Sequence, residues 1–251
     1  MTYILVTNDD GVHAPGILAL ATAVREFGEV RVVAPSINQS ASGHKKTLFQ
    51  DIPYSHTELV DGTPVLAVGG SPADCIAVAG LGALEWPPRL VVSGINRGAN
   101  MGQDVTYSGT VTAALEATIH GAPAVAFSLD NRAADHVDHY DHALPVIQAV
   151  LRGVLANPLP PLTILNVNIP ADGPVKGIRL TRQGIREYLD VLAQEDGIYR
   201  IEGDPPGGRL DQPGTDMWAV DNGYASVTPI HLDMTAHQLM AELGAWDMSL
   251  D

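Results

Sequence analysis

The feature that most constrains the fold is a series of short, almost wholly apolar runs that alternate with helical segments. The first run, residues 2–7, is followed by a polar turn at residues 8–11, a helical segment between Pro15 and Gly28, and a second apolar run at residues 29–34. Continuous apolar runs of this length are typical of strands buried on both faces. This β-loop-α-β order predicts the start of a parallel sheet with helices on its faces.

The same alternation continues along the chain. It predicts strands at residues 89–93, 122–129 and 162–168, a hairpin at residues 57–68, and helices at residues 71–81, 108–120 and 138–155. Pro145 either kinks the last of these helices or marks a later start.

The composition changes at residue 174, after which Gly, Pro and short β-like runs dominate. We expect antiparallel hairpins up to residue 229 and a closing helix at residues 235–243. The prediction is an α/β fold with a parallel-sheet core over residues 1–173 and an extension over residues 174–251. The extension is expected to serve oligomerisation and not to fold as an independent domain.

The charge balance excludes one class of partner. The 251 residues include 29 acidic and 14 basic side chains, which gives a formal net charge of −15. Binding to a nucleic-acid backbone needs clustered Lys and Arg, so a nucleic-acid scaffold is not expected. The chain opens without a basic, apolar leader and holds no apolar run long enough for a membrane span. These features predict a cytoplasmic protein with no membrane partner.

Polar residues follow three of the predicted strands. Asp9 and Asp10 follow the first strand, Ser40 lies in the loop after the second, and Asn96 follows residues 89–93. Ligands of parallel sheets collect at the carboxyl ends of the strands. Carboxylate, hydroxyl and amide oxygens suit a hard divalent cation such as Mg²⁺ or Mn²⁺. The alternative for residues 8–11 alone is a turn that caps the next helix.

A second motif precedes the Ala-rich helix at residues 108–120. Ser108, Gly109 and Thr110 stand at its start, where free backbone N–H groups can hold a phosphate. An ordinary helix cap is the alternative. Because this helix follows the Asn96 loop, its first turn is expected to face the predicted cation site.

Histidines offer two further hypotheses. His44 lies in the same loop as Ser40 and is either a surface residue or one that contacts phosphate or protonates a leaving alkoxide. Residues 135–142 place three His among three Asp, a pattern that suits either a transition metal or a solvated helix face.

Together these motifs resemble the SurE (survival protein E) nucleotidases. The resemblance rests on residues 8–11, residues 38–40 with Ser42 behind them, residues 93–102 and residues 104–111. Residues 223–229 and 233–235 resemble the C-terminal part of the same family. Each motif is weak alone, but four in this order and spacing are specific, and they cover nearly the whole chain.

The resemblance implies a Rossmann-like core and metal-dependent hydrolysis of nucleoside 5′- and 3′-monophosphates, with short polyphosphate as a further family substrate. It also implies a homodimer or tetramer whose C-terminal arm exchanges between subunits. By motif position, one Mg²⁺ or Mn²⁺ per subunit falls on Asp9, Asp10, Ser40 and Asn96. The expected catalytic residues are Asp9, Asp10 and Asn96, and the expected substrate contacts are Asn8, His44, Asn100, Ser108, Gly109 and Thr110. Residues 41–44 depart from the family's Gly-Ala-Ser run but leave Ser40 in place.

Several alternatives stay open at this point. The expected reaction is attack by a metal-activated water, and the competing one forms an aspartyl-phosphate on Asp9 or Asp10. Adjacent Asp residues also serve other metal phosphoesterases and metal-dependent sugar-nucleotide transferases. A non-enzymatic nucleotide-binding module is less favoured, because no Gly-x-Gly-x-x-Gly follows the first strand.

Overall fold

In the computed structural model, which describes residues 3–248, the buried apolar runs form one mixed sheet of nine strands. In spatial order these are β3 (Tyr54–Glu58), β4 (Pro64–Val68), β2 (Glu29–Pro35), β1 (Tyr3–Thr7), β5 (Leu90–Arg97), β6 (Ala124–Leu129), β7 (Thr163–Ile169), β11 (Ala225–His231) and β8 (Ile178–Leu180). The strands from β4 to β7 are parallel to one another. β3 is antiparallel to β4, and β11 is antiparallel to β7.

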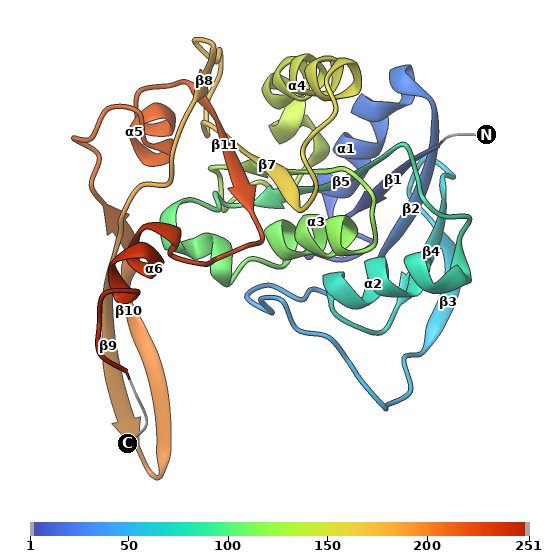
Figure 1. Cartoon of the computed structure of the whole chain (residues 1–251). Helices are drawn as coiled ribbons and strands as arrows, with labels where there is room; N and C mark the ends of the chain where they lie inside the picture. The colour runs from blue at the N-terminus through green and yellow to red at the C-terminus, as the bar shows by residue number, and fades with distance from the viewer. Residues whose placement is uncertain (1–2, 249–251) are drawn as a thin grey trace.

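Helices cover both faces of the sheet. On one face lie α1 (Pro15–Val24) and α4 (Leu144–Ala156), and on the other lie α2 (Pro72–Val78) and α3 (Gly109–Ile119), as Figure 1 shows. Ile4 and Val6 of β1 pack in the α1–α4 core, whereas Tyr3 and Leu5 pack in the α2–α3 core. A central strand with both faces covered must be apolar throughout, which is why β1 reads as a continuous apolar run.

The strand and helix order predicted up to residue 169 is confirmed, but two bounds differ. β5 continues beyond residue 93, because Asn96 pairs with Ser128 of β6 after an irregularity in the register. The predicted helix at residues 138–155 begins with a 3₁₀ segment, Val137–Ala143, and α4 starts at Leu144. Pro145 stands in the first turn of α4, where its missing N–H breaks no helical hydrogen bond.

Shorter helical turns complete this part. They are the 3₁₀ segments Arg25–Phe27 and Gly102–Thr106 and a π-helical turn at Ala79–Ala83. No helix within residues 3–248 is long and apolar enough to cross a membrane.

The C-terminal part continues the main sheet beyond residue 173. β8 and β11 both come from the C-terminal part and form its last two strands, with β8 parallel to β11. Between them the chain makes a hairpin of β9 (Arg186–Glu195) and β10 (Ile198–Gly208), and then α5 (Asp216–Asp221), a helix that the sequence pattern did not predict. The closing helix is confirmed as α6 (His237–Leu243).

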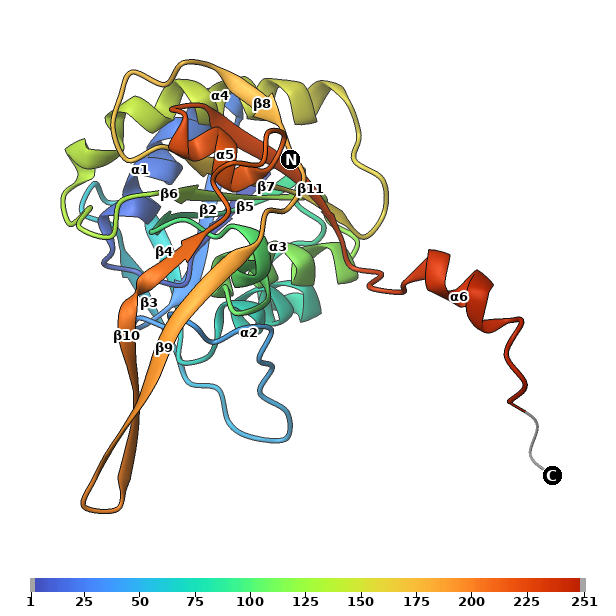
Figure 2. The ribbon, with the colours of Figure 1, turned by 90° about the vertical axis from the view of Figure 1, so that its left-hand side faces the viewer.

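The hairpin and α6 both extend away from the body of the molecule. Figures 1 and 2 together show that they leave it in different directions. Both carry exposed apolar side chains, namely Tyr188, Leu189, Val191, Leu192, Ile198, Tyr199 and Ile201 on the hairpin and Leu239 and Met240 on α6. In the isolated chain these side chains lack a covering surface.

Candidate active site

A pocket of about 880 Å³ lies at the carboxyl ends of β1 and β5, beside the first turn of α3. Residues predicted from four separate motifs line it together: Asp9, Ser40, Asn96, Asn100 and Ser108. The edge of the sheet brings them together because parallel strands all end on the same side.

Asp9 is the most deeply buried carboxylate of the pocket, with 3% of its surface exposed. Its Oδ1 accepts a hydrogen bond from Thr110 Oγ1, and a Cβ added at Gly109 would lie 2.7 Å from its Cβ. Burial raises the pKa of Asp9 to about 6; the Thr110 hydrogen bond opposes this rise and the charge of Asp10 adds to it. Gly109 and Thr110 therefore sit behind Asp9 and support it, and they do not line the pocket.

Asp10 lines a smaller neighbouring cavity of about 260 Å³. Its Oδ2 accepts a hydrogen bond from the Arg97 backbone N–H at 3.1 Å, and Asn38 Nδ2 donates to its Oδ1 at 3.4 Å. Burial raises the pKa of Asp10, while the Arg97 N–H and guanidinium oppose the rise. Asp10 thus joins the end of β1 to the end of β5.

Asn8 shapes the turn that presents the two aspartates. Its Nδ2 donates to the Gly11 carbonyl at 2.9 Å, and its Oδ1 accepts from the Gly11 N–H at 3.2 Å. Both ends of the Asn8 amide are used inside the turn, and its side chain does not line the pocket. The structure thus places Asn8 in a supporting position in the turn.

Ser40 and Asn96 offer uncharged oxygens to the pocket. Asn96 Nδ2 donates to the Gly98 carbonyl at 2.8 Å, which leaves Oδ1 as its free acceptor. Ser40 is exposed, and the neighbouring Gln39 N–H donates to the Asp9 carbonyl at 2.7 Å. That backbone bond holds the loop of Ser40 against the end of β1.

Asn100 forms the buried floor of the pocket. Its Nδ2 donates to Ser128 Oγ at 2.8 Å, and its backbone carbonyl accepts from the side chains of Asn166 and Asn168 at 2.8 and 3.0 Å. Ser108 caps α3, with its Oγ accepting from the Val111 N–H at 3.1 Å. The cap uses the Ser108 oxygen as an acceptor and leaves its O–H free to donate into the pocket.

The donor set fits a hard divalent cation. Asp9 and Asp10 supply carboxylates, Ser40 a hydroxyl and Asn96 an amide oxygen, all at one edge of the sheet. A buried carboxylate whose pKa is raised by desolvation gains most from a bound positive charge. Within residues 3–248 no cluster of three His, Cys, Asp or Glu side chains offers another cation site.

The run at residues 135–142 is therefore interpreted as a solvated face and not as a metal site. His136 and His139 are exposed. His136 Nδ1 lies 3.3 Å from Asp138 Oδ2, and His139 Nδ1 lies 3.5 Å from Asp135 Oδ1. His142 Nε2 lies 2.9 Å from the carbonyl of Pro170 instead of beside the other two histidines.

His44 does not line the pocket. Its Nε2 lies 2.9 Å from Glu116 Oε2 on α3, and Lys46 Nζ donates to Glu116 Oε1 at 2.7 Å. His120 Nε2 lies 3.1 Å from the same Oε1, and Glu116 is 2% exposed. Burial would raise the pKa of Glu116, but hydrogen bonds and charge from His44 and Lys46 lower it to about 2. Glu116 thus anchors the loop that carries Ser40 to α3.

We expect Glu116→Gln to lower the free energy of unfolding at pH 7 by roughly 2 kcal/mol, since the lowered pKa measures how strongly the folded state prefers the charged form. The contribution is complete above about pH 4.5, the ordinary value, and is lost as the pH falls through about 2. Urea unfolding of both proteins from pH 7 to pH 3 measures the difference. Glu195→Gln, at an exposed hairpin position, is the matched control. A difference that stays constant down to pH 3 would contradict the assignment.

Several pocket residues were not predicted from the sequence, and four of them are arginines or tyrosines. They are Arg97 at the end of β5, Tyr107 before α3, Arg132 after β6 and Tyr188 on β9. Arg97 and Tyr107 stand inside predicted motifs, so their position was a usable signal. Arg132 and Tyr188 reach the pocket only because the fold brings distant parts of the chain together. The Tyr188 O–H donates to Asp104 at 2.7 Å.

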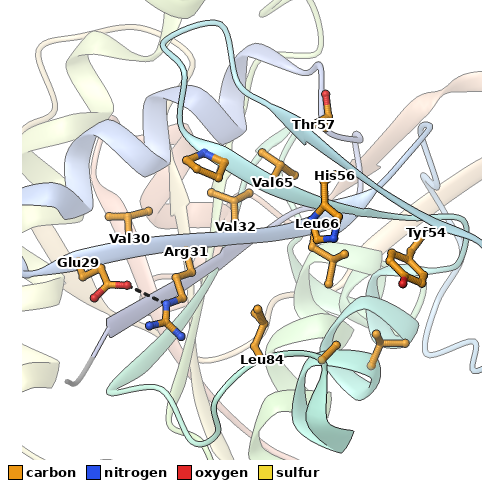
Figure 3. Close-up of a pocket in the computed structure, with 13 residues that line it drawn as sticks. Glu29, Val30, Arg31, Val32, Tyr54, His56, Thr57, Val65, Leu66 and Leu84 are labelled. Carbon is orange, nitrogen blue, oxygen red and sulfur yellow. Dashed lines mark hydrogen bonds and ion pairs between the residues drawn. The ribbon is translucent and has the colours of Figure 1, made fainter.

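A second cavity, of about 630 Å³, lies at the beginning of β2 instead of its end (Figure 3). Figure 3 shows Leu66 and Leu84 facing this space and Arg31 paired with Glu29, at 2.8 Å. It has no group of converging carboxylate and amide oxygens, so the chemistry of a cation site belongs to the first pocket.

Comparisons with known proteins point to one family. The family model "Survival protein SurE" matches residues 4–190. The chain is 43% identical over 252 residues to a protein of Chloroflexus aggregans named 5′-nucleotidase SurE, covering 98% of this chain and 99% of that protein. It is 46% identical over 253 residues to the 5′/3′-nucleotidase SurE of Escherichia coli O127:H6, covering 97% and 95%.

The fold agrees as well. The crystal structure of the SurE protein from Aquifex aeolicus superposes with a TM-score of 0.81 at 39% sequence identity, covering 96% of this chain and 98% of that one. The family model spans most of the described sheet, and the relatives match over nearly the full length. The chain belongs to the SurE family.

Proposed function

We propose that the protein is a phosphomonoesterase that hydrolyses nucleoside 5′- and 3′-monophosphates to nucleoside and inorganic phosphate. The observation that carries this proposal is the buried Asp9, which lies against the first turn of α3 in a pocket lined by Ser40, Asn96 and Ser108. The relatives named 5′-nucleotidase and 5′/3′-nucleotidase support the choice of substrate.

We assign one divalent cation per subunit, Mg²⁺ or Mn²⁺, to Asp9, Asp10, Ser40 and Asn96. When bound, such a cation lowers the pKa of water and offsets negative charge on phosphoryl oxygens. Thr110 and Gly109 fix the orientation of Asp9, and Asn8 fixes the turn between the two aspartates. Both aspartates are thus supported by neighbours that do not themselves line the pocket.

The phosphate is expected at the first turn of α3. The Ser108 O–H points a donor into the pocket, and the positive end of the helix dipole favours an anion there. We propose that water attacks phosphorus, because the oxygens of Asp9 and Asp10 are used by Thr110, by Arg97 and by the cation. Recovery of a phosphorylated Asp after acid quench of a turnover mixture would contradict this route.

The test is a panel of substrates and metals with the wild-type protein. Phosphate release is measured from nucleoside 5′- and 3′-monophosphates with Mg²⁺, with Mn²⁺ and with EDTA, and a nucleotide sugar is included. The proposal expects metal-dependent phosphate release from the monophosphates. Release of a nucleoside diphosphate from the nucleotide sugar, or tight nucleotide binding without turnover under either ion, would overturn it.

We further propose that residues 174–251 join subunits into a homodimer or tetramer, with exchange of the C-terminal arm. The support is the set of exposed apolar side chains on the β9–β10 hairpin, including the cross-strand pair Leu192 and Ile201, 65% and 76% exposed. A monomer that left this surface in water would be unusual. The cytoplasmic location stays a prediction.

The double variant Leu192→Asp with Ile201→Asp is therefore expected to shift the protein from an oligomer to a monomer, since two facing carboxylates cannot be buried in an apolar interface. Sedimentation equilibrium or light scattering measures the mass. Val60→Asp is the control, because Val60 is also exposed and apolar but lies in the β3–β4 turn. An unchanged oligomeric mass for the hairpin variant would exclude this hairpin as the interface.

A further inference from the structure

Two arginines have no partner among the residues that the structure describes, and both line the candidate active site. Arg97 ends β5 and Arg132 follows β6, and both are exposed. Among residues 3–248 neither guanidinium makes a hydrogen bond, an ion pair or a ring contact. The other arginines each have such a partner: Arg25, Arg31, Arg89, Arg152, Arg179, Arg182, Arg186, Arg200 and Arg209.

The backbone fixes both arginines close to Asn96. Arg97 follows Asn96 directly, and its N–H donates to Asp10 Oδ2 at 3.1 Å. A Cβ added at Gly98 would lie 3.3 Å from Arg132 Cγ, so the stem of Arg132 packs on Gly98. The Gly98 carbonyl in turn accepts from Asn96 Nδ2 at 2.8 Å. Both guanidiniums are therefore rooted beside the proposed cation site.

The charges around these arginines do not neutralise them. Asp104 of the same pocket is paired with Arg186 at 2.6 Å and accepts from Tyr188. Arg97 and Arg132 act only at longer range, on the pKa of Asp10 and of Asp130. Asp190 also lines the pocket but makes no ion pair with either arginine. Two guanidiniums of this pocket thus lack a direct ion pair among the described residues, in a chain with net charge −15.

Guanidinium groups bind phosphate or carboxylate through two parallel hydrogen bonds, and the anionic groups of a nucleotide are phosphates. The reacting phosphate is already assigned to Asp9 and the first turn of α3. The two arginines start from the ends of β5 and β6, and neither lies on α3. They are therefore placed for a second anionic group on the same substrate.

We propose that Arg97 and Arg132 form a subsite for a second phosphate, so that the protein prefers phosphomonoesters that carry one, such as a nucleoside 3′,5′-bisphosphate. This inference rests on the proposed phosphomonoesterase function. The subsite adds affinity for the non-reacting phosphate and takes no part in breaking the ester bond.

The test compares kcat/KM for adenosine 3′,5′-bisphosphate and for adenosine 5′-monophosphate with Mn²⁺, in wild type, Arg97→Ala and Arg132→Ala. Wild type is expected to favour the bisphosphate, and each variant is expected to lose about tenfold on the bisphosphate, the worth of one charge-assisted phosphate contact. The values for the monophosphate should fall by a clearly smaller factor. Arg152→Ala is the control, because Arg152 is exposed and ion-paired outside the pocket.

Calorimetric binding of the bisphosphate in EDTA gives a readout without turnover, and it should show the same loss in both pocket variants. Equal losses on both substrates would overturn the proposal, because the arginines would then hold the reacting phosphate. No loss on either substrate would overturn it as well. Absence of phosphate release from every substrate by wild type would instead overturn the proposed function, which separates the two failures. With tripolyphosphate as a further probe, a matching loss extends the subsite to inorganic chains, and a loss confined to the bisphosphate limits it to nucleotides.

Discussion

Asp9→Asn is expected to remove metal-dependent phosphate release almost completely, by about a hundredfold or more in kcat/KM, because it deletes a charged ligand from the proposed cation site. The same variant is expected to be more stable than wild type when no metal is present. The folded protein binds the Asp9 proton more tightly than the unfolded chain does, since burial raises this pKa to about 6. The folded state therefore loses stability as the pH rises from about 4 to about 6, and the cost is complete above that.

Removing the buried charge should recover that cost, roughly 2 kcal/mol at pH 8 in EDTA. Thermal unfolding with EDTA and with Mn²⁺ measures both effects, since Mn²⁺ should raise the Tm of wild type and leave the variant unchanged. Asp138→Asn is the control, at an exposed carboxylate outside the pocket. Near wild-type phosphate release by Asp9→Asn would show that the metal assignment is wrong.

Gly16→Ala is expected to lower the free energy of unfolding by about 3 kcal/mol or more, because the added methyl group meets backbone that cannot move aside. A Cβ at Gly16 would lie 2.1 Å from the carbonyl oxygen of Ile95, where α1 packs on the end of β5. Asn96 is the next residue, so the displacement that relieves the clash also moves a proposed cation ligand. Phosphate release should fall together with stability.

Gly153→Ala provides the matched control. Gly153 also lies in a helix, α4, but a Cβ there has no atom within 4 Å. The same substitution is therefore expected to raise stability by about 0.5–1 kcal/mol, through the lower conformational freedom of the unfolded chain. Urea unfolding of the two variants tests the sign. Similar effects at both positions would show that the contact with Ile95 is not what requires glycine.

The central strands and the polar residues at their ends were accessible to prediction because both depend on local sequence. A buried parallel strand must be apolar along its length, and the residues after it must be polar where it reaches the surface, so Asp9 and Asn96 mark strand ends without knowledge of the fold. The starts of helices could be predicted for the same reason. Pro15 favours the first turn of a helix by its conformation, and Ser108 favours the capping position before one.

The remaining features depend on contacts between distant parts of the chain. His44 was placed near the pocket by its neighbour Ser40, but Glu116, 72 residues away, holds its ring. The predicted boundary at residue 173 reflects a change in composition, whereas β11 returns to pair with β7. Arg132 enters the pocket because β6 lies beside β5. No local sequence pattern predicts that these two strands are neighbours.

The β9–β10 hairpin has a consequence for how assembly and substrate binding depend on each other. Both ends of the hairpin lead back into the main sheet through β8 and β11, and its residues Tyr188, Asp190 and Ile201 line the active-site pocket. A partner subunit that binds the outer part of the hairpin also limits the movement of the hairpin residues that line the pocket. Oligomerisation and substrate binding are then thermodynamically linked. Whatever factor oligomerisation contributes to substrate affinity, bound substrate changes the affinity between subunits by the same factor.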